Sequence, residues 1–167
     1  MNKKALVAIV LLLAFGAGYW FYTENSSKDN RFSQAGSSAP KFRKDGVLSF
    51  KTPADSTIAM IDIEIADEDW EISQGLMYRP KMASNRGMLF IFPDVRPRSF
   101  WMRNTIISLD IIFANANKEI VTIQKYTTPY SEDSVPSLED AQYVVEVNAG
   151  FCDKHGIEKG HLVEFDR

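Results

Sequence analysis

Residues 61–65, IDIEI, and residues 87–92, GMLFIF, are the two stretches of the 167-residue chain that decide its fold class. The first alternates strictly between apolar and acidic side chains, as a strand with one buried face does. The second is apolar throughout and stops at Pro93, which is typical of a more deeply buried strand. Because neither stretch repeats with a helical period, they predict a mainly β domain.

Short β runs of this kind continue to the C-terminus. Residues 110–114 and 119–123 flank an Asn-rich break, which predicts a hairpin. Other strands are expected at residues 142–147 and 162–165 and, more weakly, at residues 47–50 and 100–102. Many short strands separated by Pro and Gly favour an antiparallel sandwich or barrel.

Helical signals are confined to two short segments. An acidic turn at residues 67–69 predicts a helix that runs to about Met77 and is stopped by Pro80. A second helix is expected at residues 149–155, ended by Gly156. The sequence therefore predicts a β domain with one or two short helices.

The N-terminal segment predicts a membrane anchor at residues 1–22. Residues 5–22 carry no charge, sixteen of these eighteen residues are apolar, and Lys3 and Lys4 precede them. A cleaved signal peptide is the alternative, with Gly16 and Gly18 near the cut. Either interpretation predicts that the rest of the chain is exported. We expect that part to consist of a polar, basic tether at residues 23–44 and one globular domain at residues 45–167. The expected location is the cytoplasmic membrane, crossed once, with the domain in the periplasm or extracytoplasmic space.

Charge and cysteine content exclude several classes of function. Residues 1–44 hold seven Lys/Arg and two Asp/Glu, a net of +5, whereas residues 45–167 hold twelve and twenty, a net of −8. The domain thus lacks the basic excess that nucleic-acid binding needs. The single Cys152 excludes an intramolecular disulfide and a cysteine-based zinc cluster, and we expect neither metal nor cofactor.

Six blocks of sequence carry a family resemblance. They lie at residues 75–79, 86–92, 100–105, 109–113, 143–150 and 156–160. In order and spacing they resemble domain-of-unknown-function family 192 over about residues 58–165. The resemblance implies a compact β domain of sandwich or jelly-roll character, often exported behind one membrane segment, and it implies no activity. Ser108 and His161 depart from the family pattern, which usually has proline and aspartate there.

A basic and aromatic segment is the candidate binding site. Residues 79–103 hold six Lys/Arg and one Asp, and Trp101 lies among them. Arginine forks suit carboxylates and phosphates, and an indole ring offers a stacking face. The candidate ligand-binding residues are Arg79, Arg98, Trp101, Arg103, Asn104, Thr105, Asp110 and Glu146. The alternative is that these arginines are solvated strand ends and the short polar residues form turns.

Three functions remain open on the sequence. The first is a membrane-tethered binding or accessory module for an anionic or glycan-like envelope ligand or a partner protein. The second is an envelope polysaccharide hydrolase that uses Asp110 and Glu146, although Arg79 as a partner would explain Glu146 structurally. The third is a protein-assembly module with an exposed patch around Trp101. The chain contains no known catalytic motif such as Gly-x-Ser-x-Gly or His-Glu-x-x-His, so no catalytic residue is assigned.

Overall fold

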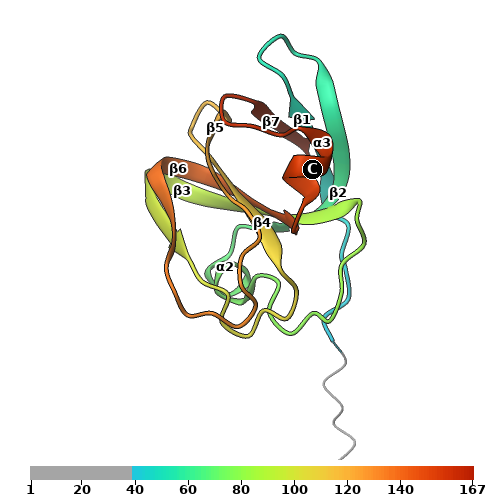
Figure 1. Ribbon diagram of the computed structural model, residues 1–167, viewed down its shortest axis with the longest axis vertical. Helices are drawn as coiled ribbons and strands as arrows, with labels where there is room; N and C mark the ends of the chain where they lie inside the picture. Colours follow the sequence, from blue (N-terminus) through green and yellow to red (C-terminus); the bar gives the residue numbers. More distant parts are fainter. Residues whose placement is uncertain (1–38) are drawn as a thin grey trace, which may run out of the picture. The chain divides into compact units, whose positions relative to one another are not determined.

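The computed structural model describes residues 39–167, and these form a mainly β unit (Figure 1). The strands are β1 (Gly46–Lys51), β2 (Thr57–Ala66), β3 (Arg86–Phe100), β4 (Leu109–Ala114), β5 (Ile120–Gln124), β6 (Val135–Asn148) and β7 (Leu162–Asp166). The helices are α2 (Asp69–Gln74) and α3 (Phe151–His155). The expected anchor and residues 23–38 of the expected tether lie outside the described residues. No helix within residues 39–167 has the length and apolar character needed to cross a bilayer.

One seven-stranded sheet curls into a half-barrel in place of the two packed sheets of a sandwich. Its strand order is β5-β4-β6-β3-β2-β1-β7. Neighbouring strands are antiparallel except β2 and β3, which are parallel. The exception arises because residues 67–85, which include α2, return the chain to the end of the sheet where β2 began. The expected antiparallel arrangement is thus wrong for this one pair.

The sheet curls far enough that its two edge strands meet at one corner. The backbone N–H of Ile120 donates to the carbonyl of His161 at 2.8 Å, and that of Val163 donates to the carbonyl of Lys118 at 2.9 Å. Pairing of this kind satisfies backbone groups that a free sheet edge would leave to solvent. The curl encloses α3 (Figure 1).

Apolar side chains fill both faces of the central strands. The inner core lies inside the curl and includes Leu48, Ile63, Ile112, Val145, Phe151 and Val163. The outer core lies on the opposite face and includes Leu76, Phe90, Met102, Ile111, Phe113 and Val144. Burial on both faces explains why β4 is apolar at almost every position and does not alternate.

Two element boundaries differ from expectation. Helix α2 ends at Gln74 because Gly75 takes a φ of 48°, a left-handed conformation that Gly adopts at little cost. Strand β3 passes through Pro93 and continues to Phe100, so residues 87–92 and Phe100 belong to one strand. Pro93 is tolerated because the pairing with β6 breaks register between Ile91 and Arg96, where no ladder N–H is required.

Ordered contacts also precede β1. The Arg43 guanidinium donates to the carbonyl of Ile65 at 3.0 Å, and the Arg86 guanidinium lies 4.2 Å from the centre of the Phe42 ring. The part of the expected tether that the structure describes, residues 39–44, therefore packs against the domain.

Asp110 attaches α3 to the sheet. Its side chain is fully buried; Oδ1 accepts a hydrogen bond from the Tyr126 N–H and Oδ2 accepts one from the Cys152 N–H, both at 3.0 Å. A carboxylate can accept from both donors at once, whereas any apolar residue would leave the buried N–H of Cys152 and the partly buried N–H of Tyr126 unpaired.

We therefore expect Asp110→Ala to lower the free energy of unfolding by about 2 kcal/mol, because an orphaned buried N–H, here that of Cys152, costs about 1–3 kcal/mol. Asp110→Asn keeps one acceptor oxygen and should lose about half as much. Urea unfolding followed by circular dichroism measures both. The exposed Asp140→Ala is the matched control, expected within about 0.5 kcal/mol of the wild type. Equal stability of Asp110→Ala and the control would contradict this role.

Candidate functional site

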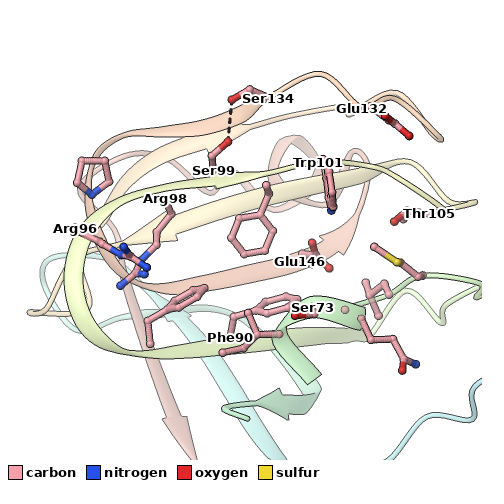
Figure 2. A pocket seen from close by; sticks show the side chains of 18 residues that line it. Ser73, Phe90, Arg96, Arg98, Ser99, Trp101, Thr105, Glu132, Ser134 and Glu146 are labelled. Atoms are coloured by element: carbon pink, nitrogen blue, oxygen red, sulfur yellow. Dashed lines mark hydrogen bonds between the residues drawn. The ribbon is translucent and has the colours of Figure 1, made fainter. Parts of the chain in front are cut away.

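A cleft of about 560 Å³ opens on the outer face of the sheet, between α2 and the end of β3 (Figure 2). Phe90, Phe92 and Phe100 form its apolar wall, and Ser99 and Ser134 lie at its rim, where their hydroxyl groups are 2.8 Å apart. An apolar pocket with a few polar groups is the ordinary form of a small-ligand site.

Glu146 forms the polar floor of the cleft. Strand register places Glu64 of β2, Met88 of β3, Glu146 of β6 and Ile111 of β4 in one row across the outer face. Glu146 is only 5% exposed and lines the cleft, and its Oε2 has no hydrogen-bond partner. Burial raises the pKa of this carboxyl to about 8, with the charge of Arg79 opposing the rise. Burial therefore favours the neutral form of this carboxyl, which can both donate and accept a hydrogen bond.

Arg79 forms its ion pair with Glu64 and not with Glu146. Its Nη1 donates to Glu64 Oε1 at 2.6 Å, and its Nη2 donates to Glu64 Oε2. The Arg43 N–H also donates to Glu64 Oε1, at 2.8 Å. The terminal nitrogens of Arg79 therefore bind Glu64 and not Glu146, whereas its Nε has no hydrogen-bond partner and its charge still acts on Glu146, as the sequence-based suggestion expected.

The other candidate arginines are paired as well. Arg98 is buried; it donates to the carbonyl of Ala141 at 3.1 Å and to Asp94 Oδ1 at 2.7 Å, and it stacks on the Phe92 ring at 4.0 Å. Its hydrogen bond lowers the pKa of Asp94 below the ordinary value. Arg103 Nε lies 3.9 Å from Glu132 Oε1, and the guanidinium carbon of Arg103 lies 5.4 Å from the centre of the Trp101 ring. Asp94 is shared by Arg96 and Arg98, and the contact between Arg103 and Glu132 joins two exposed side chains and is weak.

Trp101 and Thr105 are the predicted residues that, with Glu146 and Arg98, line the cleft. Trp101 directly follows β3 and is 47% exposed, and both Trp101 and Glu146 point into the cleft (Figure 2). Asn104 instead forms a turn with a φ of 55°, and its carbonyl accepts from the Tyr78 N–H at 2.9 Å.

Asp110 and Glu146 do not meet. Asp110 pairs with Val147 and Ile111 pairs with Glu146, so the two carboxyl groups lie on opposite faces of the sheet. Asp110 binds α3 on the inner side, and Glu146 lines the cleft on the outer side. The predicted acid–base pair is therefore wrong, since no substrate could contact both groups.

Sequence reasoning missed several residues of the cleft. Gly75 lies at its edge, and a Cβ built there would be 3.3 Å from the Phe90 ring and 3.8 Å from Glu146 Oε2. The sequence signal that could have identified Gly75 was its position in the family block at residues 75–79. Ser99 and Ser134 carried no signal, because they come from segments that only the β3–β6 pairing brings together.

The part of the chain that the structure describes offers no grouping of three or more His, Cys, Asp and Glu side chains suited to a metal ion. Cys152 is buried among apolar side chains, and burial raises the pKa of its thiol, which makes it a poor nucleophile.

The fold and cleft define a class: a curled β domain with an α-helix inside the curl and a carboxyl-floored cleft on the outer face. The chain belongs to domain-of-unknown-function family 192, described as an uncharacterised family, whose profile matches residues 50–165. The resemblance noted in the sequence is thereby confirmed.

Two solved structures are similar to this chain. A proposed transcription regulator from Sinorhizobium meliloti 1021 is 34% identical, with a TM-score of 0.70, over 75% of this chain and 98% of that protein. A protein of unknown function from Novosphingobium aromaticivorans DSM 12444 is 30% identical, with a TM-score of 0.67, over 78% of this chain and 95% of that protein. No curated protein matches the chain.

The Glu64–Arg79 pair yields a stability prediction. Arg79→Met should destabilise the domain by about 3–5 kcal/mol, because it leaves a buried carboxylate without its cation. The double variant Glu64→Leu with Arg79→Met should recover much of that loss, since no charge remains buried there. Urea unfolding of the two variants and of Arg96→Met, whose ion pair with Asp94 is exposed, provides the comparison. An Arg79→Met loss as small as that of Arg96→Met would contradict the assignment.

Glu146 yields a pH prediction. A folded-state pKa above the unfolded value means that the folded protein binds the extra proton, so this stabilising contribution is present at low pH and is lost as pH rises towards about 8. Glu146→Gln does not titrate. Its free energy of unfolding should therefore rise relative to the wild type by about 1.4 kcal/mol per pH unit between pH 5 and pH 8, and then level off. Urea unfolding at half-unit intervals tests this, and a difference that does not change with pH would refute it.

Proposed function

We propose that the domain is a non-catalytic binding module whose cleft holds an uncharged, glycan-like ligand. The observation that carries this proposal is the unpartnered, buried Oε2 of Glu146 in a cleft that Trp101 also lines. A polar atom buried without a partner is costly, and a ligand hydroxyl or amide would supply what the protein does not. The exposed indole ring offers a flat apolar surface to the C–H face of a sugar ring.

The pairing of charges favours a neutral ligand over an anionic one. The terminal nitrogens of Arg79 are bound to Glu64, and Arg98 is buried and bound to Asp94, so a ligand phosphate or carboxylate would compete with these contacts. Of the two ligand types suggested by the sequence, the glycan-like one fits the geometry better.

A binding role also agrees with the single carboxyl group on the floor. Among the described residues, Glu132 is the other carboxylate that lines the cleft; its side chain is 71% exposed and lies beside Arg103. Glycoside hydrolysis uses two carboxyl groups that flank the bond to be cut, one acting as acid and one as base or nucleophile. Glu146 lacks such a buried companion.

The expected location is part of the proposal. Residues 1–22 would hold the domain at the outer surface of the cytoplasmic membrane, where it would meet envelope glycans. The net charge of −8 over residues 45–167 supports a partner other than nucleic acid. The proposed role in transcription regulation belongs to the Sinorhizobium meliloti protein and is not part of this proposal.

The protein-assembly alternative stays a prediction. Trp101, Ile106 and Tyr130 are exposed on neighbouring loops, where the Tyr130 N–H donates to the carbonyl of Thr105 at 3.1 Å. Such a patch could contact a protein partner, but the same Trp101 also serves the cleft.

We expect Trp101→Ala to weaken glycan binding about tenfold or more, because it removes the stacking surface of the cleft. Trp70→Ala is the matched control: Trp70 is 64% exposed on α2 and does not line the cleft. Titration of the full-length chain with a panel of neutral oligosaccharides, followed by calorimetry, measures the effect. Equal affinity of the two variants for every bound sugar would place the ligand elsewhere.

A further inference from the structure

Three loops at one end of the sheet carry exposed aromatic and aliphatic side chains. Residues 76–85 precede β3, residues 101–108 precede β4 and residues 125–134 follow β5. The first residues of β3 and β4 both lie beside the end of β6, and Figure 1 shows the three loops together at the end of the domain where α2 lies. The large exposed side chains that define this loop face are Tyr78, Trp101, Ile106 and Tyr130.

Two tyrosines of the loop face occupy backbone positions that suit other residues better. Tyr78 and Tyr130 have φ angles of 63° and 61°, a left-handed conformation that Gly or Asn adopts at lower cost. The N–H of each donates to a carbonyl of residues 101–108, at 2.9 Å and 3.1 Å, so the three loops hold one another in place. Tyr126 has the same conformation, but its hydroxyl donates to Asp153 at 2.6 Å. The exposed rings of Tyr78 and Tyr130 are not required by their turns, which indicates a contact outside the domain.

The chain enters the domain beside the loop face. The Arg43 N–H and the guanidinium of Arg79, the residue after Tyr78, both donate to Glu64 Oε1. Figure 1 shows the first described residues, in cyan, at the same end of the domain as the loops. Residues 23–38 could span at most roughly 55 Å when fully extended. An anchor within residues 1–22, as proposed above, would therefore hold this end of the domain near the bilayer.

We propose that the loop face docks on the lipid interface of the membrane to which the domain is tethered. Tyrosine and tryptophan favour the headgroup region of a bilayer, because their rings combine an apolar body with a polar edge. Ile106 adds an aliphatic side chain that the same region accommodates. The inference rests on the membrane location in the proposed function and not on the ligand of the cleft. Trp101 borders both the cleft and the loop face, whereas Tyr78, Ile106 and Tyr130 do not line the cleft.

Charge on the loops is balanced, so lipid charge is not what holds the face. Basic and acidic side chains on and beside the three loops offset one another: Lys81, Arg103 and Lys125 against Glu132, Asp133 and Asp153. Interfacial binding of this kind scales with the apolar area that enters the interface. We therefore expect the loop face to dock equally well on phosphatidylcholine and on a mixture that contains phosphatidylglycerol.

Nitroxide labels on the full-length chain, reconstituted in phosphatidylcholine vesicles, measure the depth of the loop face. The native Cys152 is fully buried, so a thiol reagent labels only an introduced cysteine. With Ile106→Cys and Tyr130→Cys, we expect labels that lie about 5–10 Å into the headgroup–acyl boundary, more accessible to oxygen than to a polar nickel chelate. The control is Met60→Cys: Met60 is 61% exposed in the β1–β2 hairpin at the other end of the domain (Figure 1), and its label should be aqueous.

A charge placed on the loop face should undock it. In a chain labelled at Tyr78→Cys, adding Ile106→Glu should return the label to aqueous accessibility, because a carboxylate is costly at the lipid boundary. Adding Met60→Glu in its place should leave the depth of the label unchanged. Both substitutions lie at exposed residues, and circular dichroism verifies that the variants fold. Sugar binding in the cleft should be the same for Ile106→Glu and the wild type, since Ile106 does not line it.

A further label at Leu12→Cys separates this inference from the location on which it rests. A label at position 12 in hydrocarbon, with aqueous labels at positions 106 and 130, would overturn the docking and leave the membrane location intact. Labels at positions 106 and 130 that are shielded from both oxygen and nickel would show a protein contact in place of lipid, and docking that requires phosphatidylglycerol would overturn the apolar contact. An aqueous label at position 12, or a chain that has lost residues 1–22, would overturn both the docking and the location.

Discussion

The buried ion pair between Glu64 and Arg79 is the interaction on which the rest of the structure depends. It binds the segment after α2 to β2, and so closes the outer core over the sheet. A charge can be buried only where it is compensated, and one guanidinium fork matches one carboxylate. Glu146, in the same cross-strand row, has no ion pair of its own, and burial raises its pKa against the opposing charge of Arg79. The carboxyl group on the floor of the cleft thus lacks an ion pair because the terminal nitrogens of Arg79 bind Glu64.

The packing of the half-barrel holds Glu64, Arg79 and Glu146 in these positions. Strand β4, residues 87–90 of β3 and residues 144–147 of β6 are buried on both faces, so the side chains that point outward there are held as firmly as those that point inward. Gly75 then allows the chain to approach the Phe90 ring more closely than a residue with a side chain would. Asp110 performs the corresponding task on the inner face by anchoring α3. Two carboxyl groups of neighbouring strands therefore have unrelated functions, one structural and one directed at a cleft.

Predictions from local pattern succeeded where local pattern controls structure. The period-two runs located most strands, the Asn-rich break located the β4–β5 turn, and the acidic turn before Trp70 located α2. Predictions failed where a distant segment supplies the partner. The parallel pairing of β2 with β3, the passage of β3 through Pro93 and the end of α2 at Gly75 each depend on the packing of residues 67–85 and on the register with β6.

Composition and periodicity alone establish a mainly β domain with an acidic net charge and a single cysteine, and the six sequence blocks identify its family. They also single out Trp101 and Glu146 as unusual. Only the folded chain shows that Glu146 shares a cleft with Trp101, that Asp110 lies on the far face, and that Arg79 belongs to Glu64. The physical reason is that the faces of a sheet and the partners of a charge depend on register between strands. Register is set by contacts between residues remote in sequence, which no single segment encodes.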